Sequence, residues 1–338
     1  MSTPSKSMVH IDRPLSNISI AYSQSADAFA AARVFPVVPV AKQSDKYWVY
    51  LRAAFLRDEM RKRAPGTESA GGGWQMTTDS YSCDVWAFHK DLDNQTLANY
   101  DEPLNARRET TEYLTQKFLI SREKNWVTNF FGTGIWTREK TGAASGATGN
   151  QFNQWDAPST ADPIKDVSTW KLQMLKETGY KPNVMTVGAQ VWEALKQSPD
   201  ILDRVKFQSS ANGQPSLVSR QTIAALFEVD EIIVSEAIAS AVGEAVPDVA
   251  NTAAAVASDF IAGKHLLLSY RPRTPGLLTP SAGYTFEWTG LEGGGGYNSA
   301  ISSFYLAEIK SERIEIEAAY ASKQVCNDLG TFALNVIA

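Results

Sequence analysis

The chain of 338 residues is poor in the side chains that most often carry out catalysis. It has three histidines (His10, His89, His265) and two cysteines (Cys83, Cys326), and they lie in unrelated segments. No CxxC pair is present, so a zinc site is not expected. The phosphate-binding GxxxxGK[ST] loop, the HExxH zinc motif and the GxSxG nucleophile motif are also missing. We therefore expect no catalytic residue, no metal site and no cofactor.

Long hydrophobic runs and an excess of positive charge are missing too. No run approaches the roughly 18 apolar residues that a membrane-spanning helix needs, and the first residues lack the apolar core of a secretion signal. The net charge is -5, so a surface built to grip DNA phosphates is not expected, although a mildly acidic wall could face packed DNA without sticking to it. With 43% hydrophobic and 20% charged residues, the composition predicts a globular chain of about two domains.

The first 45 residues predict an extended arm. The stretch 31–40 is apolar and contains Pro36 and Pro39, which remove backbone donors and favour an extended chain. An exposed segment this apolar needs a partner surface. We therefore expect an arm over residues 1–45 that lies across another surface.

Residues 46–90 predict a long β-hairpin. Aromatic and β-branched residues indicate a strand over 46–51 and a returning strand over 74–90, and the glycines at 66 and 71–73 mark a flexible tip between them. The tip has too little apolar surface to form a core of its own, so we expect it to contact another molecule. The candidate contact residues in this hairpin are Arg57, Arg61, Lys62, Arg63 and Trp74.

The rest of the chain predicts an α+β fold. A helix of about 45 Å is expected over 102–131, opened by the acidic residues before Pro103 and ended by Gly132, with Glu109 and Glu112 on its charged face and a sheet covering its apolar one. Residues 132–160 read as a loop and 237–262 as a surface insertion. The other expected helices are 163–178, 189–197 and 220–227, and the expected strands are 184–187, 231–234, 265–270, 284–288, 304–309 and 313–320.

Two stretches resemble the major capsid proteins of tailed bacteriophages. The first is 181–196 (KPNVMTVGAQVWEALK) with 200–207 (DILDRVKF), and the second is 312–316 (ERIEI) with Tyr320 and 330–332 (GTF). The resemblance implies the Johnson fold, which herpesvirus capsid floors and encapsulin shells share. It adds Glu312 and Arg313 to the candidate inter-subunit contacts. The implied parts are an N-terminal arm 1–45, an extended loop 46–90, a peripheral domain 91–180 with a spine helix 102–131, an axial domain 181–300, and closing strands with a return to the axial domain over 301–338.

The function implied by this resemblance is a structural subunit of an icosahedral phage head. Such a subunit assembles in the host cytoplasm into hexamers and pentamers that enclose double-stranded DNA in the virion. The implied partners are further copies of the chain, a separate scaffold protein, a portal, a decoration protein and non-specifically contacted DNA, with no membrane. The alternatives are an encapsulin-type nanocompartment shell and a hydrolase that uses a carboxylate pair, for which Asp58, Glu59, Asp79 and Asp84 are the candidates.

Some relatives in this family join a lysine of the extended loop to an asparagine of the neighbouring peripheral domain, with help from a glutamate. Lys62 and Glu312 are the corresponding amine and acid here. No asparagine lies in 303–311, and Asn298 is too far displaced. We therefore expect a mature shell without covalent cross-links.

Overall fold

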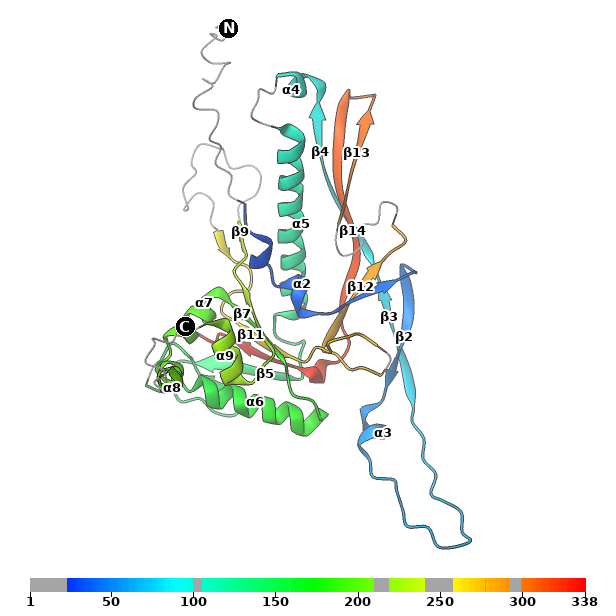
Figure 1. Cartoon of the computed structure of the whole chain (residues 1–338), viewed down its shortest axis with the longest axis vertical. Coiled ribbons are helices and arrows are strands. Elements are labelled where there is room, and N and C mark those ends of the chain that lie inside the picture. The colour runs from blue at the N-terminus through cyan, green and yellow to red at the C-terminus, as the bar shows by residue number, and fades with distance from the viewer. Residues whose placement is uncertain are drawn as a thin grey trace.

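The computed structural model describes residues 23–99, 105–157, 159–209, 219–240, 258–276, 278–291 and 299–338. Figure 1 shows three regions: a lower body in which helices cover a sheet, an upright layer in which one long helix lies along a second sheet, and a hairpin that projects away from both.

The lower body is built on a six-stranded mixed sheet with the order β6-β5-β15-β11-β7-β8. Its strands β11 and β7 are buried along their whole length, as their apolar sequences dictate. The strands are β5 (Arg138–Ala143), β6 (Gln151–Asn153), β7 (Val184–Gly188), β8 (Glu231–Ser235), β11 (Leu266–Ser269) and β15 (Gly330–Leu334). The helices are α6 (Pro163–Thr178), α7 (Ala189–Gln197), α8 (Pro199–Ser209) and α9 (Arg220–Phe227).

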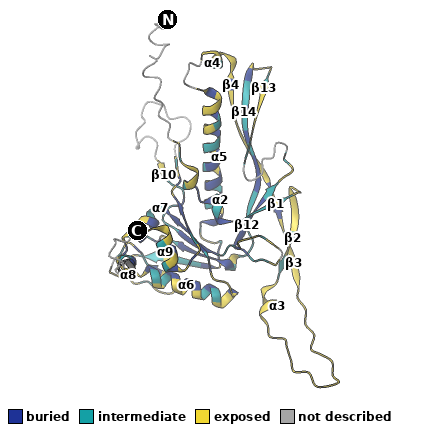
Figure 2. Cartoon of the chain, in the orientation of Figure 1, coloured by how far each residue is buried: buried dark blue, intermediate teal, exposed yellow. Residues whose placement is uncertain are grey.

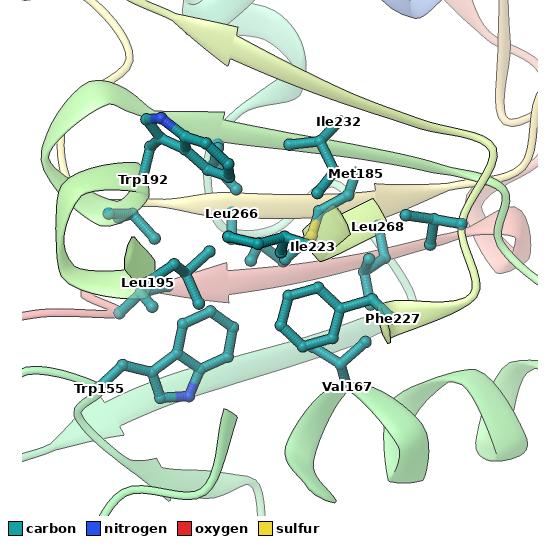
Figure 3. Packing of buried hydrophobic residues seen from close by; sticks show 14 of the residues in the cluster. Trp155, Val167, Met185, Trp192, Leu195, Ile223, Phe227, Ile232, Leu266 and Leu268 are labelled. Atoms are coloured by element: carbon teal, nitrogen blue, oxygen red, sulfur yellow. The ribbon is translucent and has the colours of Figure 1, made fainter. Parts of the chain in front are cut away.

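Alternate residues of these strands point to opposite faces of the sheet and so belong to two separate hydrophobic cores. Met185, Leu266 and Leu268 point to the helices α6 to α9, where they meet residues such as Leu195 and Ile223 (Figure 3). The residues between them face the other way and pack against the long helix and the arm; these are Val184, Ile233, Leu267 and Phe332. The sheet is therefore covered on both faces by its own chain.

The upright layer consists of α5 (Ala106–Phe130) lying along the long strand β14 (Ser311–Gln324). Leu114 and Leu119 of the helix are buried against Ile314 and Ile316 of the strand. This confirms the prediction that a sheet covers the long helix. The second sheet has the order β1-β12-β14-β13, with β4 on the other side of β14. Its strands besides β14 are β1 (Val37–Val40), β4 (Asp84–Asp93), β12 (Gly283–Trp288) and β13 (Ala300–Leu306).

The ends of α5 differ from the prediction. Asn105 has an extended backbone and caps the helix, since its side chain accepts a hydrogen bond from the Arg108 N–H. The helix therefore begins at Ala106, and the predicted start at 101–103 lies outside the described residues. At the other end Phe131 is the cap, so a left-handed glycine at Gly132 is not what ends the helix.

The arm was predicted to need another surface, and over residues 29–40 that surface is its own chain. Phe29, Val34 and Phe35 are buried in the two cores beside α5, and β1 pairs in parallel with β12. The prolines do keep the segment from forming a long helix: it contains only the short turns η1 (Ala26–Ala28) and α2 (Ala31–Val34). The first 22 residues of the predicted arm lie outside the described residues.

The hairpin is shorter than predicted. It consists of β2 (Ser44–Tyr50), α3 (Arg52–Leu56) and β3 (Met76–Ser82), with β2 and β3 antiparallel. The single returning strand 74–90 is wrong, because the strand breaks at Cys83, whose thiol is buried against β12, and continues as β4 in the other sheet. The short helix α4 (Asn94–Asn99) follows.

Two predicted irregular segments contain strands. Residues 132–160 were read as a loop, but β5 and β6 form there because β15 offers β5 a parallel edge. The predicted insertion 237–262 begins and ends with a short pair, β9 (Ile238–Ser240) and β10 (Ser258–Phe260), and residues 241–257 lie outside the described residues. The turn η2 (Asn327–Leu329) precedes β15.

Candidate inter-subunit surfaces

The root of the hairpin is packed firmly on the body. The rings of Tyr81 and Phe286 are stacked with centroids 4.5 Å apart. Asp79 accepts a hydrogen bond from the Tyr47 hydroxyl at 2.7 Å and pairs with Lys323 of β14 at 2.8 Å. These hydrogen bonds, that from Lys323 first, lower the pKa of Asp79 below its usual range. The root is thus fixed by aromatic stacking and one charged cluster.

A second anchor lies where the hairpin leaves the body. The Arg52 guanidinium pairs with the Asp328 carboxylate at 2.7 Å, and the same carboxylate accepts a hydrogen bond from the Thr137 hydroxyl at 2.8 Å. Arg52 stands at the start of α3, directly after β2, whereas Asp328 lies in η2. The two anchors hold both sides of the hairpin and so set the direction in which it projects.

Beyond these anchors the hairpin contacts only itself. Every residue from 57 to 75 is exposed, which Figure 2 shows as a continuous yellow loop. The contacts within it are local, such as the pair between Arg57 and Glu59 and the hydrogen bond from the Arg63 side chain to the Thr67 carbonyl. The loop adds nothing to the cores of its own chain.

The five hairpin residues singled out from the sequence all lie in this exposed loop. Arg61 and Lys62 have no ion-pair partner among the described residues, and Trp74 is 63% exposed. Residues 57–75 hold four basic and three acidic residues, a net charge of +1. The loop therefore presents unneutralised positive charge and an exposed indole, which suits an acidic and partly apolar partner surface.

Sequence reasoning missed an aromatic face nearer the root. Neighbouring residues of a strand point to opposite faces, so Tyr47 faces the body while Trp48 and Tyr50 face outward. Trp48 is 63% exposed, and Met76, opposite Tyr50, is exposed beside it. The signal was present in the sequence, because the adjacent aromatics Tyr47 and Trp48 cannot both be buried on one side of a two-stranded ribbon.

The candidates in the upright layer are engaged in pairs within the chain. Glu112 pairs with Arg108 at 2.9 Å, and Glu312 of β14 pairs with Arg107 of α5 at 2.7 Å. Arg313 holds both oxygens of the Asp91 carboxylate on β4, at 2.7 and 2.8 Å. Glu109 is exposed on the same end of α5. The pairs made by Glu312 and Arg313 tie the helix and β4 to β14, so any contact with a neighbour would be additional to them.

A depression of about 680 Å³ lies between the arm and the ends of β7, β8 and β11. Its carboxylate Glu231 is held between Arg33 and Arg271, the latter at 2.7 Å. Burial would raise the pKa of Glu231, but the hydrogen bonds from the two guanidiniums outweigh burial and lower it. A carboxylate whose ionised form is stabilised in this way suits a structural ion pair between the arm and the body better than it suits a general base.

The described residues hold no group of three His, Cys, Asp or Glu side chains arranged to bind a metal ion. Among the same residues, no helix combines the length and apolar character needed to cross a bilayer.

Comparison with known proteins gives relatives over nearly the whole chain. No protein-family model matches. The major capsid protein of Pseudomonas phage JBD67 is 26% identical over 333 residues, which is 97% of each chain. The major capsid protein of Burkholderia phage BcepMu is 23% identical over 295 residues, covering 83% of this chain and 84% of the relative.

Solved structures share the fold. A phage-related protein from Bordetella bronchiseptica RB50 has a TM-score of 0.64 at 19% identity, covering 93% of this chain and 94% of that one. The capsid of cyanophage P-SCSP1u has a TM-score of 0.56 at 9% identity over 94% and 90%. The SrpI encapsulin of Synechococcus elongatus PCC 7942 has a TM-score of 0.51 at 12% identity over 99% and 96%.

Fold, exposed hairpin and relatives together define a shell-forming structural protein of the α+β Johnson-fold class, not an enzyme. Within that class, the chain is similar over nearly its whole length to phage major capsid proteins, and it is a structural capsid subunit whose place is the capsid of the virion. Copies of the chain assemble with one another into a capsid shell.

Proposed function

We propose that this chain forms the hexamers and pentamers of an icosahedral head that encloses double-stranded DNA. The observation that carries the proposal is the hairpin, whose loop 57–75 is wholly exposed while its root is fixed on the body. In this proposal the upright layer with α5 is the peripheral domain and the lower body is mainly the axial domain, which would pack around the five- and six-fold axes. Such contacts are heterologous and close into rings.

The hairpin crosses onto a neighbouring subunit in this proposal. Ile314 and Ile316 face α5, so Glu315 and Glu317 must point to the opposite face of the sheet. That acidic face complements the net positive charge of the hairpin loop. Single exposed pairs contribute only about 0 to 1 kcal/mol. The exposed apolar residues of the hairpin, above all Trp48 and Trp74, are therefore proposed to supply most of the contact energy.

Further partners belong to the proposal as well. A separate scaffold protein would set the curvature of the growing shell, a portal would occupy one vertex, and a decoration protein could bind the outer surface. The enclosed DNA would be contacted without sequence specificity, since the net charge of -5 gives the chain no general affinity for phosphates.

Deleting residues 60–75 tests the role of the hairpin. The variant should keep its circular dichroism spectrum and its cooperative unfolding, because the loop lies outside every core, but it should fail to form rings or shells in electron micrographs. Reversing the charge of Arg61, Lys62 and Arg63 should weaken assembly in a salt-dependent way. A deletion that unfolds the body, or one that still assembles normally, would contradict the proposal.

The encapsulin-type alternative is distinguished by what the particles contain. Particles purified from infected or induced cells should carry nuclease-protected double-stranded DNA. Particles that hold a protein cargo and no DNA would favour the nanocompartment instead.

A further inference from the structure

The upright sheet has two edges of opposite character. On one side of β14 lies β4, which carries charges at its two ends, at Asp84 and at Lys90, Asp91 and Asp93, around the apolar stretch 85–88. On the other side lies β13, Ala300–Leu306, with the sequence AISSFYL. Strand edges in natural proteins are usually protected from pairing by charge, proline or a covering segment. The β4 edge has such charges at both ends, whereas β13 contains no charged residue, no proline and no glycine over its whole length.

The side chains of β13 are also unusually exposed for such a sequence. Ile301, Phe304 and Tyr305 are 42%, 43% and 57% exposed. The strand is the outermost of its sheet and projects with the upper part of β14 (Figure 1), so one side of its backbone has no strand beside it within the described residues. An apolar, uncharged edge of seven residues is a template for another strand.

We propose that β13 pairs with β13 of a second copy of this chain, antiparallel and across a two-fold axis. Among the described residues, the other edge strands of four or more residues are less suited to pair with the uncharged strand β13. Those of the hairpin carry Lys46 and Asp79, β1 contains Pro39, and β8 is covered by the arm, where the Glu236 N–H donates to the Ala28 carbonyl. An identical uncharged strand brings no charge to the contact.

A register centred on Ser303 makes the two strands complementary. Ser303 then lies opposite its own counterpart, Ile301 lies opposite Tyr305 of the second copy, and Ser302 lies opposite Phe304 of the second copy. Each of these pairs keeps its members on the same face of the sheet, because the paired positions differ by an even number of residues. Aliphatic residues against aromatic ones are among the favourable cross-strand pairs. The result is one continuous sheet that runs through both copies.

This inference deepens the proposed function, because it names one contact between copies, but it stands on β13 and not on the hairpin. The hairpin contact is heterologous and closes rings, whereas the β13 contact is isologous and joins two subunits about a two-fold axis. Rings in a shell must be joined to one another, and a two-fold contact at β13 would join them.

Cysteine cross-linking at the centre of the register tests the contact. Directly opposite Cβ atoms lie roughly 4.5–5.5 Å apart, within reach of mild oxidation or a short bismaleimide. Ser303→Cys should therefore give covalent dimers on a non-reducing gel, at least tenfold above Ala87→Cys on β4, the opposite edge of the same sheet. The unsubstituted chain, with buried Cys83 and half-buried Cys326, sets the background. Dimer yields from Ser303→Cys no higher than from Ala87→Cys, in free chains and in shells alike, would overturn the inference.

A second pair of variants separates this contact from the hairpin. Phe304→Lys places a charge on the β13 edge and should reduce the Ser303→Cys dimer at least tenfold, whereas Ala87→Lys should leave it unchanged. In the chain that lacks residues 60–75, the Ser303→Cys dimer should persist even though rings no longer form. Persistence there supports the β13 contact whatever happens to the hairpin proposal, and shells that form without any cross-link at residue 303 refute it.

Discussion

The lower body buries its large apolar side chains within its own chain, whereas the hairpin leaves large apolar side chains exposed. In the lower body, Met185, Leu266 and Leu268 are fully buried beneath four helices of the same subunit. In the hairpin, Trp48 and Trp74 remain exposed, although their indole rings are larger than any of those side chains. The difference teaches that this sequence keeps part of its hydrophobic surface for other molecules.

The two regions also differ in how they are held. The body gains its stability from burial, whereas the hairpin depends on its root, where one stacked pair of rings and two charged anchors fix the direction of an otherwise free loop. Variants in the body should therefore change folding, and variants in the hairpin should change assembly.

The largest expected effect is the loss of a buried side chain in the body. Leu268→Ala should lower the free energy of unfolding by about 2–5 kcal/mol, because Leu268 is fully buried and the cavity would not collapse. Urea titration followed by tryptophan fluorescence would measure it. The matched hairpin variant Trp74→Ala should change stability by less than about 0.5 kcal/mol and yet reduce assembly. Equal stability losses in the two variants would erase the distinction between the regions.

An intermediate effect is expected at the hairpin root. Asp79→Asn keeps an acceptor for Tyr47 but removes the ion pair with Lys323. Because both partners are partly exposed, stability should fall by only about 0 to 1 kcal/mol, and less at high salt. The hairpin should be cut faster by trypsin at the basic residues 61–63. Unchanged proteolysis in Asp79→Asn would show that the stacked rings and the Arg52–Asp328 pair fix the root without the ion pair of Asp79.

The sequence predicted the lower body better than the rest because its signals are local. Helix α6 was placed correctly over 163–178, where Asp162 caps the first turn, Pro163 suits its start and Gly179 ends it with a positive φ. Helices 189–197 and 220–227 were also confirmed. In contrast, β5 has the sequence REKTGA, which carries no strand pattern, and forms only because β15 lies beside it.

The candidate site was predicted in part. The charges of the hairpin loop stand out in the sequence, whereas the break at Cys83 depends on a buried contact with β12 that no local pattern announces. The proline rule correctly excluded a long helix in the arm but could not show that residues 29–35 fill the gap between α5 and β8. The buried carboxylate of Glu123, which joins these elements, was not predicted, because a glutamate in a charged helix usually faces solvent.

Glu123 predicts a modest pH effect on the body. Its carboxylate is fully buried and accepts hydrogen bonds from the Ala31 N–H and the Ser235 hydroxyl, each at 2.8 Å. Burial raises its pKa above the usual value, and these hydrogen bonds only partly oppose that. The folded state therefore binds this proton more tightly than the unfolded chain does.

It follows that the contribution of Glu123 to stability is present below pH 4.5, the usual glutamate value, and is lost as the pH rises through the raised pKa. The difference in melting temperature between Glu123→Gln and the unsubstituted chain should thus change over that range of pH. Glu68→Gln, in the exposed loop, serves as the control for replacing a glutamate by a glutamine outside every core. A flat difference for Glu123→Gln would contradict the raised pKa.

The smallest expected effect, none at all, concerns covalent cross-links between the hairpin and a neighbour. Cross-linking needs an amine that can lose its proton, an amide as electrophile and a carboxylate to take the proton. Lys62 lies in the exposed loop between Arg61 and Arg63, where water solvates its charge. Glu312 is occupied by Arg107 at 2.7 Å, so it is held as an ion-pair partner within its own subunit. No asparagine lies in 303–311, the turn and strands beside it.

Mature particles boiled in detergent should therefore give one band near 37.0 kDa, and Lys62→Arg should leave that pattern unchanged. A ladder of multimers that survives reducing agent and disappears in Lys62→Arg would show that the hairpin, unlike the body, is finally held by covalent bonds.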